Sequence, residues 1–122
     1  MQMNNSMNMM NNSVLETDLA LLRRNAESIV RAIPAGTKLL PVLKCDAYGL
    51  GAAEIARVLE PLEAVAGFAV AHVSEGLALR NAGITKDILV MSSALPWQLS
   101  AAVEANLTLA CGRAGFASEL QA

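Results

Sequence analysis

Four short apolar runs recur along the chain, at intervals of about 20 to 25 residues, and segments with helical patterning separate them. Such runs are apolar throughout rather than alternating, which is typical of strands that are covered on both faces of a parallel sheet. Strands that alternate with helices predict an α/β fold built from parallel βα units. The expected strands cover residues 38–43, 66–71, 88–91 and 107–110.

Helices are expected between these strands, and the clearest covers residues 18–32. Apolar side chains recur there every three or four positions, and Pro34 with Gly36 ends the helix. A short strand is expected before it, at 14–17. Further helices are expected over 52–59, over 75–81 with Ser74 as N-cap, from Pro96 to about Val103, and from Gly115 to Ala122.

Two residues weaken elements of this pattern. Pro41 has no N–H group to donate within its strand, so an edge position or a bulge is expected there. Gly76 costs its helix about 1 kcal/mol relative to alanine, which a packed helix tolerates.

The length bounds the architecture. A closed (β/α)8 barrel needs eight strands and typically about 250 residues, whereas this chain has 122 residues and four expected barrel strands. The pattern predicts roughly the first half of such a TIM-type barrel over residues 14–122, incomplete as given. A four-stranded flavodoxin-like sheet is the alternative. Residues 1–13 are rich in Met and Asn and are expected to form a disordered tail.

Composition argues against several classes of partner. The net charge is −2 and aromatic residues make up 3% of the chain, so neither nucleic acid nor an anionic membrane surface is an expected partner. No apolar run approaches the roughly 18 residues of a membrane span. Cys45 and Cys111 are expected to be reduced thiols in a cytoplasmic protein.

The residues after the first of these strands carry the candidate chemistry. Lys44 follows the strand directly, and the turn after it holds Tyr48. Catalytic groups of βα barrels lie at the carboxyl ends of the strands, and a lysine amine can condense with an aldehyde cofactor. A solvated lysine and a packed tyrosine ring are the alternatives. Cys45 is expected to be a small buried hydrophobe, and His72 a solvated or core histidine.

Other site types find little support. Gly49-Leu50-Gly51 leads into a helix and could hold a phosphate on its N–H groups, but Glu54 stands where a dinucleotide fingerprint has its third glycine. The carboxylates form no paired constellation, and no His, Cys and Asp residues have the spacing of metal ligands.

Residues 42–51, VLKCDAYGLG, resemble the pyridoxal-phosphate attachment motif of alanine racemases. The similarity continues on both sides of the motif, from about Leu15 to at least Met91. Cys45 stands where the family commonly has alanine, and Leu50 where histidine is common. The further colinear blocks are 15–19, 24–25, 67–71, 75–80, 83–84 and 88–91.

This resemblance implies a pyridoxal-phosphate-dependent isomerase that interconverts L- and D-alanine for cell-wall peptidoglycan, cytoplasmic and homodimeric in its complete form. It implies that Lys44 binds the cofactor covalently and acts as one catalytic base, that Tyr48 reaches the cofactor phosphate, and that Met91 packs near the cofactor ring. The second base is implied to be a tyrosine from the partner's C-terminal β-domain. Residues 1–122 alone are therefore expected to be inactive.

Alternatives remain within and outside this family. Serine or another amino acid is an alternative substrate, because the contacts that set substrate preference are expected beyond Ala122. A non-catalytic pyridoxal-phosphate-binding barrel would also present a lysine at a strand end, although the turn of residues 46–49 speaks against it. A truncated, inactive remnant is the third possibility.

Overall fold

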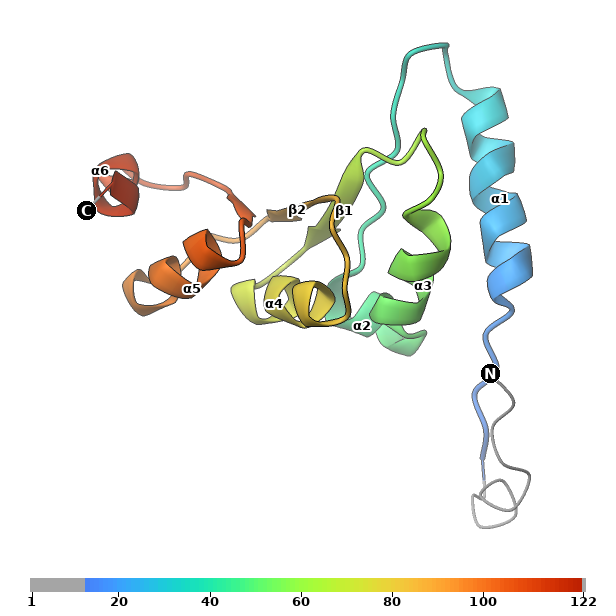
Figure 1. Cartoon of the computed structure of the whole chain (residues 1–122), viewed down its shortest axis with the longest axis horizontal. Coiled ribbons are helices and arrows are strands. Elements are labelled where there is room, and N and C mark those ends of the chain that lie inside the picture. The colour runs from blue at the N-terminus through green and yellow to red at the C-terminus, as the bar shows by residue number, and fades with distance from the viewer. Residues whose placement is uncertain (1–12, 122) are drawn as a thin grey trace.

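The computed structural model describes residues 13–121 (Figure 1). The expected tail of residues 1–13 therefore lies, apart from Ser13, outside the described residues. Helices alternate with short strands along the chain. In order, the elements are α1 (Leu19–Ala32), α2 (Lys44–Gly49), α3 (Ala52–Leu59), β1 (Gly67–Val70), α4 (Val73–Asn81), β2 (Asp87–Val90), the 3-10 helix η2 (Pro96–Gln98), α5 (Leu99–Glu104), β3 (Thr108–Leu109) and α6 (Phe116–Gln121).

The three strands form one parallel sheet in the order β1-β2-β3. Ala69 pairs with Leu89, and Leu89 pairs with Thr108. Residues 39–42 add a fourth extended segment beside β1 through isolated parallel bridges. The spatial order therefore follows the chain order. A flavodoxin-like sheet would place its second strand outside its first, so the sheet has the order of part of a βα barrel.

The first extended segment is interrupted where Pro41 lies. Leu39 bridges to Val65, whereas Val42 bridges to Ala69, so the register shifts by one residue between the two bridges. Pro41 accepts a hydrogen bond from Ala69 N–H at 2.9 Å but has no N–H group to return. The expected strand at 38–43 is therefore present as a bulged segment rather than a continuous strand.

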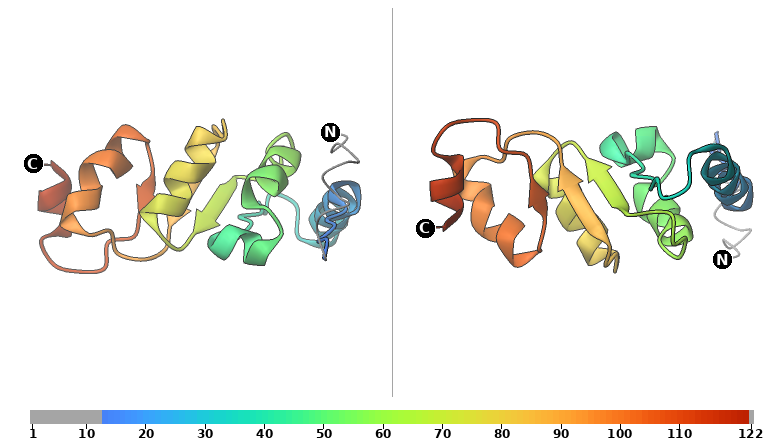
Figure 2. Two further views of the ribbon diagram at one scale, coloured as in Figure 1. Left: turned by 90° about the horizontal axis from the view of Figure 1, so that it is seen from below. Right: turned by 90° about the horizontal axis from the view of Figure 1, so that it is seen from above.

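Helices cover one face of this sheet. Figure 2 shows α4 in front of the strands from below and behind them from above. Phe68, Ile88 and Val90 are fully buried in the core beneath the helices. On the sheet, Leu40, Val42 and Met91 remain 44%, 46% and 41% exposed, so part of the apolar surface has no cover within the described residues.

A close approach accounts for the glycine within α4. A Cβ atom on Gly76 would lie 2.9 Å from Leu107 Cδ1 and 3.5 Å from Ile88 Cγ2. The absence of a side chain lets α4 pack closely against β2 and the segment before β3. This packing compensates for the low helix propensity of glycine.

Several expected element bounds need correction. Residues 14–17 form no strand, and Val14 and Leu15 are 64% and 68% exposed, with no neighbouring strand among the described residues. Helix α4 begins at Val73, so His72 and not Ser74 is its N-cap. The segment after Pro96 starts with a 3-10 turn before α5. Helix α3 matches its expected bounds.

Candidate functional site

Lys44 lies where the first extended segment ends, at the same edge of the sheet as the carboxyl ends of β1 and β2. The residue before it, Leu43, donates its N–H to Ala69 O at 2.7 Å. The chain has two other lysines. Lys38 Nζ donates to Glu63 O at 3.0 Å, and Lys86 Nζ donates to Leu62 O at 2.7 Å. Within residues 13–121, only the half-buried Lys44 has an amine without a hydrogen-bond partner.

The backbone after Lys44 winds in a left-handed turn. Cys45, Asp46, Ala47 and Tyr48 have φ between 52° and 56° and ψ between 37° and 45°. For residues other than glycine this conformation costs roughly 1–2 kcal/mol each. The sequence predicted a turn here, but the hand of the turn is a new finding. Four consecutive residues in this region require contacts that hold them there.

The turn brings Tyr48 back towards Lys44. The distance between Lys44 Nζ and the centroid of the Tyr48 ring is 5.9 Å, within the range of a cation–π contact. Tyr48 is 72% exposed, so its hydroxyl is accessible to a ligand. The two residues therefore place an amine beside a phenol ring with an accessible hydroxyl, at the carboxyl end of the strands.

Two carboxylates hold the turn. Asp46 Oδ1 accepts a hydrogen bond from Ala52 N–H at 2.8 Å, at the start of α3. Glu75, in the first turn of α4, accepts from Cys45 N–H at 2.6 Å through Oε1. Its other oxygen, Oε2, accepts from Ala71 N–H at 2.8 Å and from His72 N–H at 2.9 Å.

The sequence alone indicates no role for Glu75 at the site. A glutamate three residues after a helix N-cap commonly bonds back to the N-cap N–H, and the contact with His72 is of this kind. If His72 had been recognised as the N-cap, the sequence would have predicted the hydrogen bond from His72 N–H to Glu75. The bond to Cys45 joins residues 30 positions apart and leaves no local signal in the sequence.

These contacts also determine the ionisation of Glu75. Burial raises the pKa of the carboxyl group, but the N–H groups of Cys45, His72 and Ala71 stabilise the anion more strongly. The pKa of Glu75 is therefore lowered from its ordinary value. Glu75 binds the turn as a carboxylate.

Met91 lies at the same edge of the sheet, directly after β2. Its N–H donates to Val70 O at 2.9 Å, and its side chain is 41% exposed. Val42, Ala69 and Leu89 lie side by side in the sheet. Lys44 is two residues after Val42, and Met91 is two residues after Leu89, so both come just beyond the carboxyl ends of neighbouring strands. The structure thus places Lys44, Tyr48 and Met91 at one edge.

Two other residues considered from the sequence lie nearby. Cys45 is exposed, so the expectation of a buried hydrophobe was wrong, because the left-handed turn breaks the alternation of the strand. His72 is exposed, with Nδ1 3.4 Å from Ser92 Oγ. Ser92 Oγ also bonds to Ala71 O.

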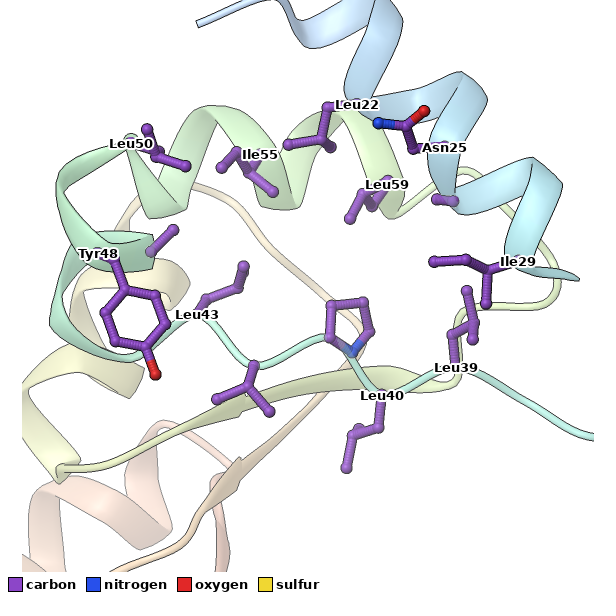
Figure 3. A pocket seen from close by; sticks show the side chains of 14 residues that line it. Leu22, Asn25, Ile29, Leu39, Leu40, Leu43, Tyr48, Leu50, Ile55 and Leu59 are labelled. Carbon is purple, nitrogen blue, oxygen red and sulfur yellow. The ribbon is translucent and has the colours of Figure 1, made fainter. Parts of the chain in front are cut away.

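A groove of about 430 Å³ lies between α1, α3 and residues 39–43, and Tyr48 of α2 lines it as well (Figure 3). Leu22 and Ile29 of α1 line one side, and Ile55 and Leu59 of α3 line another. Its lining includes no charged residue. An anionic ligand would therefore find no counter-charge in this groove, and the candidate site is the sheet edge at Lys44.

Residues 13–121 contain no group of three or more His, Cys, Asp and Glu side chains arranged to hold a metal ion. In the same part of the chain, each helix is too short or too polar to cross a membrane.

The chain matches the family model of the alanine racemase N-terminal domain over residues 17–122. Alanine racemase from Geobacter sulfurreducens is 44% identical over 98 residues, which are 80% of this chain and 25% of the relative. Alanine racemase from Aquifex aeolicus is 38% identical over 79% of this chain and 28% of its own length. The chain thus spans about a quarter of these relatives.

Solved structures agree with the sequence matches. The alanine racemase of Clostridium difficile 630 superposes with a TM-score of 0.76 and 33% identity, over 81% of this chain and 26% of that one. The enzyme of Bacillus anthracis, solved with bound L-Ala-P, gives a TM-score of 0.75 and 32% identity over 84% and 26% of the two chains. The fold is therefore that of part of the barrel domain in these structures.

Proposed function

Because the chain belongs to the alanine racemase N-terminal domain family, we propose that it contributes the lysine half of the active site in a pyridoxal-phosphate-dependent alanine racemase. The observation that carries this proposal is the unpaired amine of Lys44 beside Tyr48, at the sheet edge where barrel enzymes hold their catalytic groups. The chain's membership of this family is the basis on which we propose a homodimer as the complete form. Racemisation needs a second acid or base on the opposite face of the substrate, and in this proposal the partner subunit supplies it.

The residues at this edge fit a pyridoxal phosphate. The amine of Lys44 is free to take the aldehyde, and the exposed hydroxyl of Tyr48 can donate to a phosphate oxygen. The partly exposed side chain of Met91 offers apolar contact to a ring. When bound, the cofactor supplies an electron sink for the negative charge left after removal of the α-proton.

Lys44 Nζ has two roles in this proposal. It holds the cofactor before substrate arrives, and once displaced it accepts or returns the α-proton on one face. Proton transfer on the other face requires a group that we assign to the partner subunit. Residues 1–122 by themselves are therefore proposed to hold the cofactor without racemising alanine.

The test is reductive labelling of residues 1–122. The protein is incubated with pyridoxal phosphate, reduced with borohydride and mapped by peptide mass spectrometry. We expect the label on Lys44 in preference to Lys38 and Lys86, whose amines are already bonded to carbonyl oxygens. Equal labelling of the three lysines, or labelling of another one, would contradict the proposal.

Tyr48→Phe is the matched variant for the phosphate contact. It keeps the ring beside Lys44 and removes only the hydroxyl. We expect Lys44 to remain the labelled residue. The cofactor concentration that gives half-maximal labelling should rise by about tenfold or more, the effect of losing one hydrogen bond to a charged group. Unchanged half-saturation would remove Tyr48 from the proposed site.

A further inference from the structure

The left-handed turn after Lys44 is conformationally unfavourable unless contacts hold it. Its four residues have side chains that disfavour positive φ, and together they set the direction in which Lys44 leaves the sheet. A turn that relaxed towards the right-handed region would move Lys44 relative to Tyr48. The contacts at the first residue of the turn therefore bear directly on the lysine.

The far end of the turn is held mainly by contacts close in sequence. Gly51 N–H donates to Asp46 O at 3.1 Å, and Ala52 N–H donates to Asp46 Oδ1 at 2.8 Å. Thr17 Oγ1 adds a longer bond to Leu50 O at 3.3 Å. The bonds to Asp46 close the loop on itself, the bond from Thr17 links it to the residues before α1, and none of the three attaches it to the sheet.

The near end is attached to the sheet by Glu75. Its Oε1 binds the N–H of Cys45, the residue directly after Lys44, while its Oε2 binds the N–H groups of Ala71 and His72 at the end of β1. Strand β1 is buried and lies between β2 and the extended segment 39–42. One carboxylate thus joins the strained turn to a rigid part of the fold.

We propose that Glu75 is the positioning residue for Lys44: it holds the left-handed turn so that the lysine amine points to the cofactor site. This role rests on the proposed function. It requires a carboxylate, because both oxygens act as acceptors at once. In a Glu75→Gln variant the side-chain amide has one acceptor oxygen, and its NH₂ group would face N–H donors.

The first test compares reductive labelling by pyridoxal phosphate in three proteins: residues 1–122, Glu75→Gln and Glu60→Gln. Glu60 is a matched control, since its Oε1 accepts from Thr85 N–H at 2.6 Å and Lys86 N–H at 2.9 Å at the other end of the strands. We expect Glu75→Gln to lower the preference for Lys44 over Lys38 by about tenfold, the effect of one lost charged hydrogen bond. Glu60→Gln should leave the preference unchanged.

The second test is rescue by glycine. Cys45→Gly removes the cost of positive φ at the residue that Glu75 holds. Added to Glu75→Gln, it should recover part of the lost preference for Lys44. A purely structural role of Glu75 in α4 predicts no such recovery. Equal effects of Glu75→Gln and Glu60→Gln, or no effect of either, would overturn the proposal.

Hydrogen exchange tests the turn without cofactor. We expect the Cys45 amide to exchange about tenfold faster in Glu75→Gln than in Glu60→Gln, because the single oxygen of the glutamine amide cannot accept from Cys45 and from the end of β1 at once. Unchanged exchange would overturn the role of Glu75. If the parent protein shows no preference for Lys44, the proposed function fails, and this measurement alone decides whether Glu75 holds the turn. If Glu75→Gln loses its helical circular dichroism, Glu75→Asp, which keeps the charge but shortens the reach, takes its place.

Discussion

Glu60 and Glu75 bind main-chain N–H groups at opposite ends of the strands. Glu60 accepts hydrogen bonds from the N–H groups of Thr85 and Lys86, just before β2. Glu75 accepts hydrogen bonds from N–H groups just after β1. Burial raises the pKa of the Glu60 carboxyl, but hydrogen bonds from Lys86 and Thr85 outweigh this effect, and its pKa is lowered. Both side chains act in the folded protein as carboxylates.

Their lowered pKa values predict a loss of stability in acid. A group with a folded pKa below its unfolded value of 4.5 stabilises the fold fully above that value, and the contribution disappears as pH falls through the folded pKa. We expect the difference in free energy of unfolding between the parent protein and Glu60→Gln to shrink as pH is lowered through 4.5. Urea unfolding over a pH series measures it, and a constant difference would contradict the prediction.

At the scale of elements, Arg80 connects adjacent βα units. Its guanidinium donates from α4 to Ala105 O at 2.9 Å and to Asn106 O at 3.0 Å, beyond α5. It also donates to Ile84 O at 2.8 Å and to Lys86 O at 2.7 Å, before β2. The planar guanidinium of Arg80 thus donates to carbonyl groups of two loops, one before β2 and one before β3, which meet at the amino-terminal ends of the strands.

Arg80→Lys should therefore destabilise the fold. A lysine amine cannot reach all these carbonyls at once, and we expect the free energy of unfolding to fall by about 1–3 kcal/mol. Arg57→Lys is the control, because Arg57 bonds to the single carbonyl of Ala82 and should cost about 0.5 kcal/mol or less. Equal losses in the two variants, measured by urea unfolding of dilute protein, would contradict this interpretation of Arg80.

The elements differ in how far the sequence predicts them. Helix α3 was predicted with its observed bounds, because apolar spacing and the preceding glycines are local signals. The left-handed turn was not predicted, because one of the contacts that hold it, from Cys45 N–H to Glu75 Oε1, joins residues thirty positions apart. The motif identified Lys44 and Tyr48 as candidates. Glu75, the residue proposed to position Lys44, could be found only from the structure, which brings the start of α4 next to the end of the first extended segment.

At the scale of the whole molecule, the two outermost strands of the sheet each have one side without a neighbouring strand, and part of the apolar surface of the sheet is uncovered. Residues 39–42 form one edge and β3 the other. Leu40 and Val42 are nearly half exposed on the sheet. In a complete barrel every strand has two neighbours and the inner side chains pack in layers. The described residues provide neither closure nor this packing.

We therefore expect a polypeptide of residues 1–122 to self-associate. Open parallel edges and exposed apolar side chains both favour contact between copies. Sedimentation velocity should show species heavier than the monomer that increase with protein concentration. The double variant Leu40→Gln and Val42→Gln should shift the distribution towards monomer, whereas Leu21→Gln, at a site on α1 that is 46% exposed, should not. A parent protein that remains monomeric at every concentration, or an equal shift in both variants, would show that the sheet surface does not drive association.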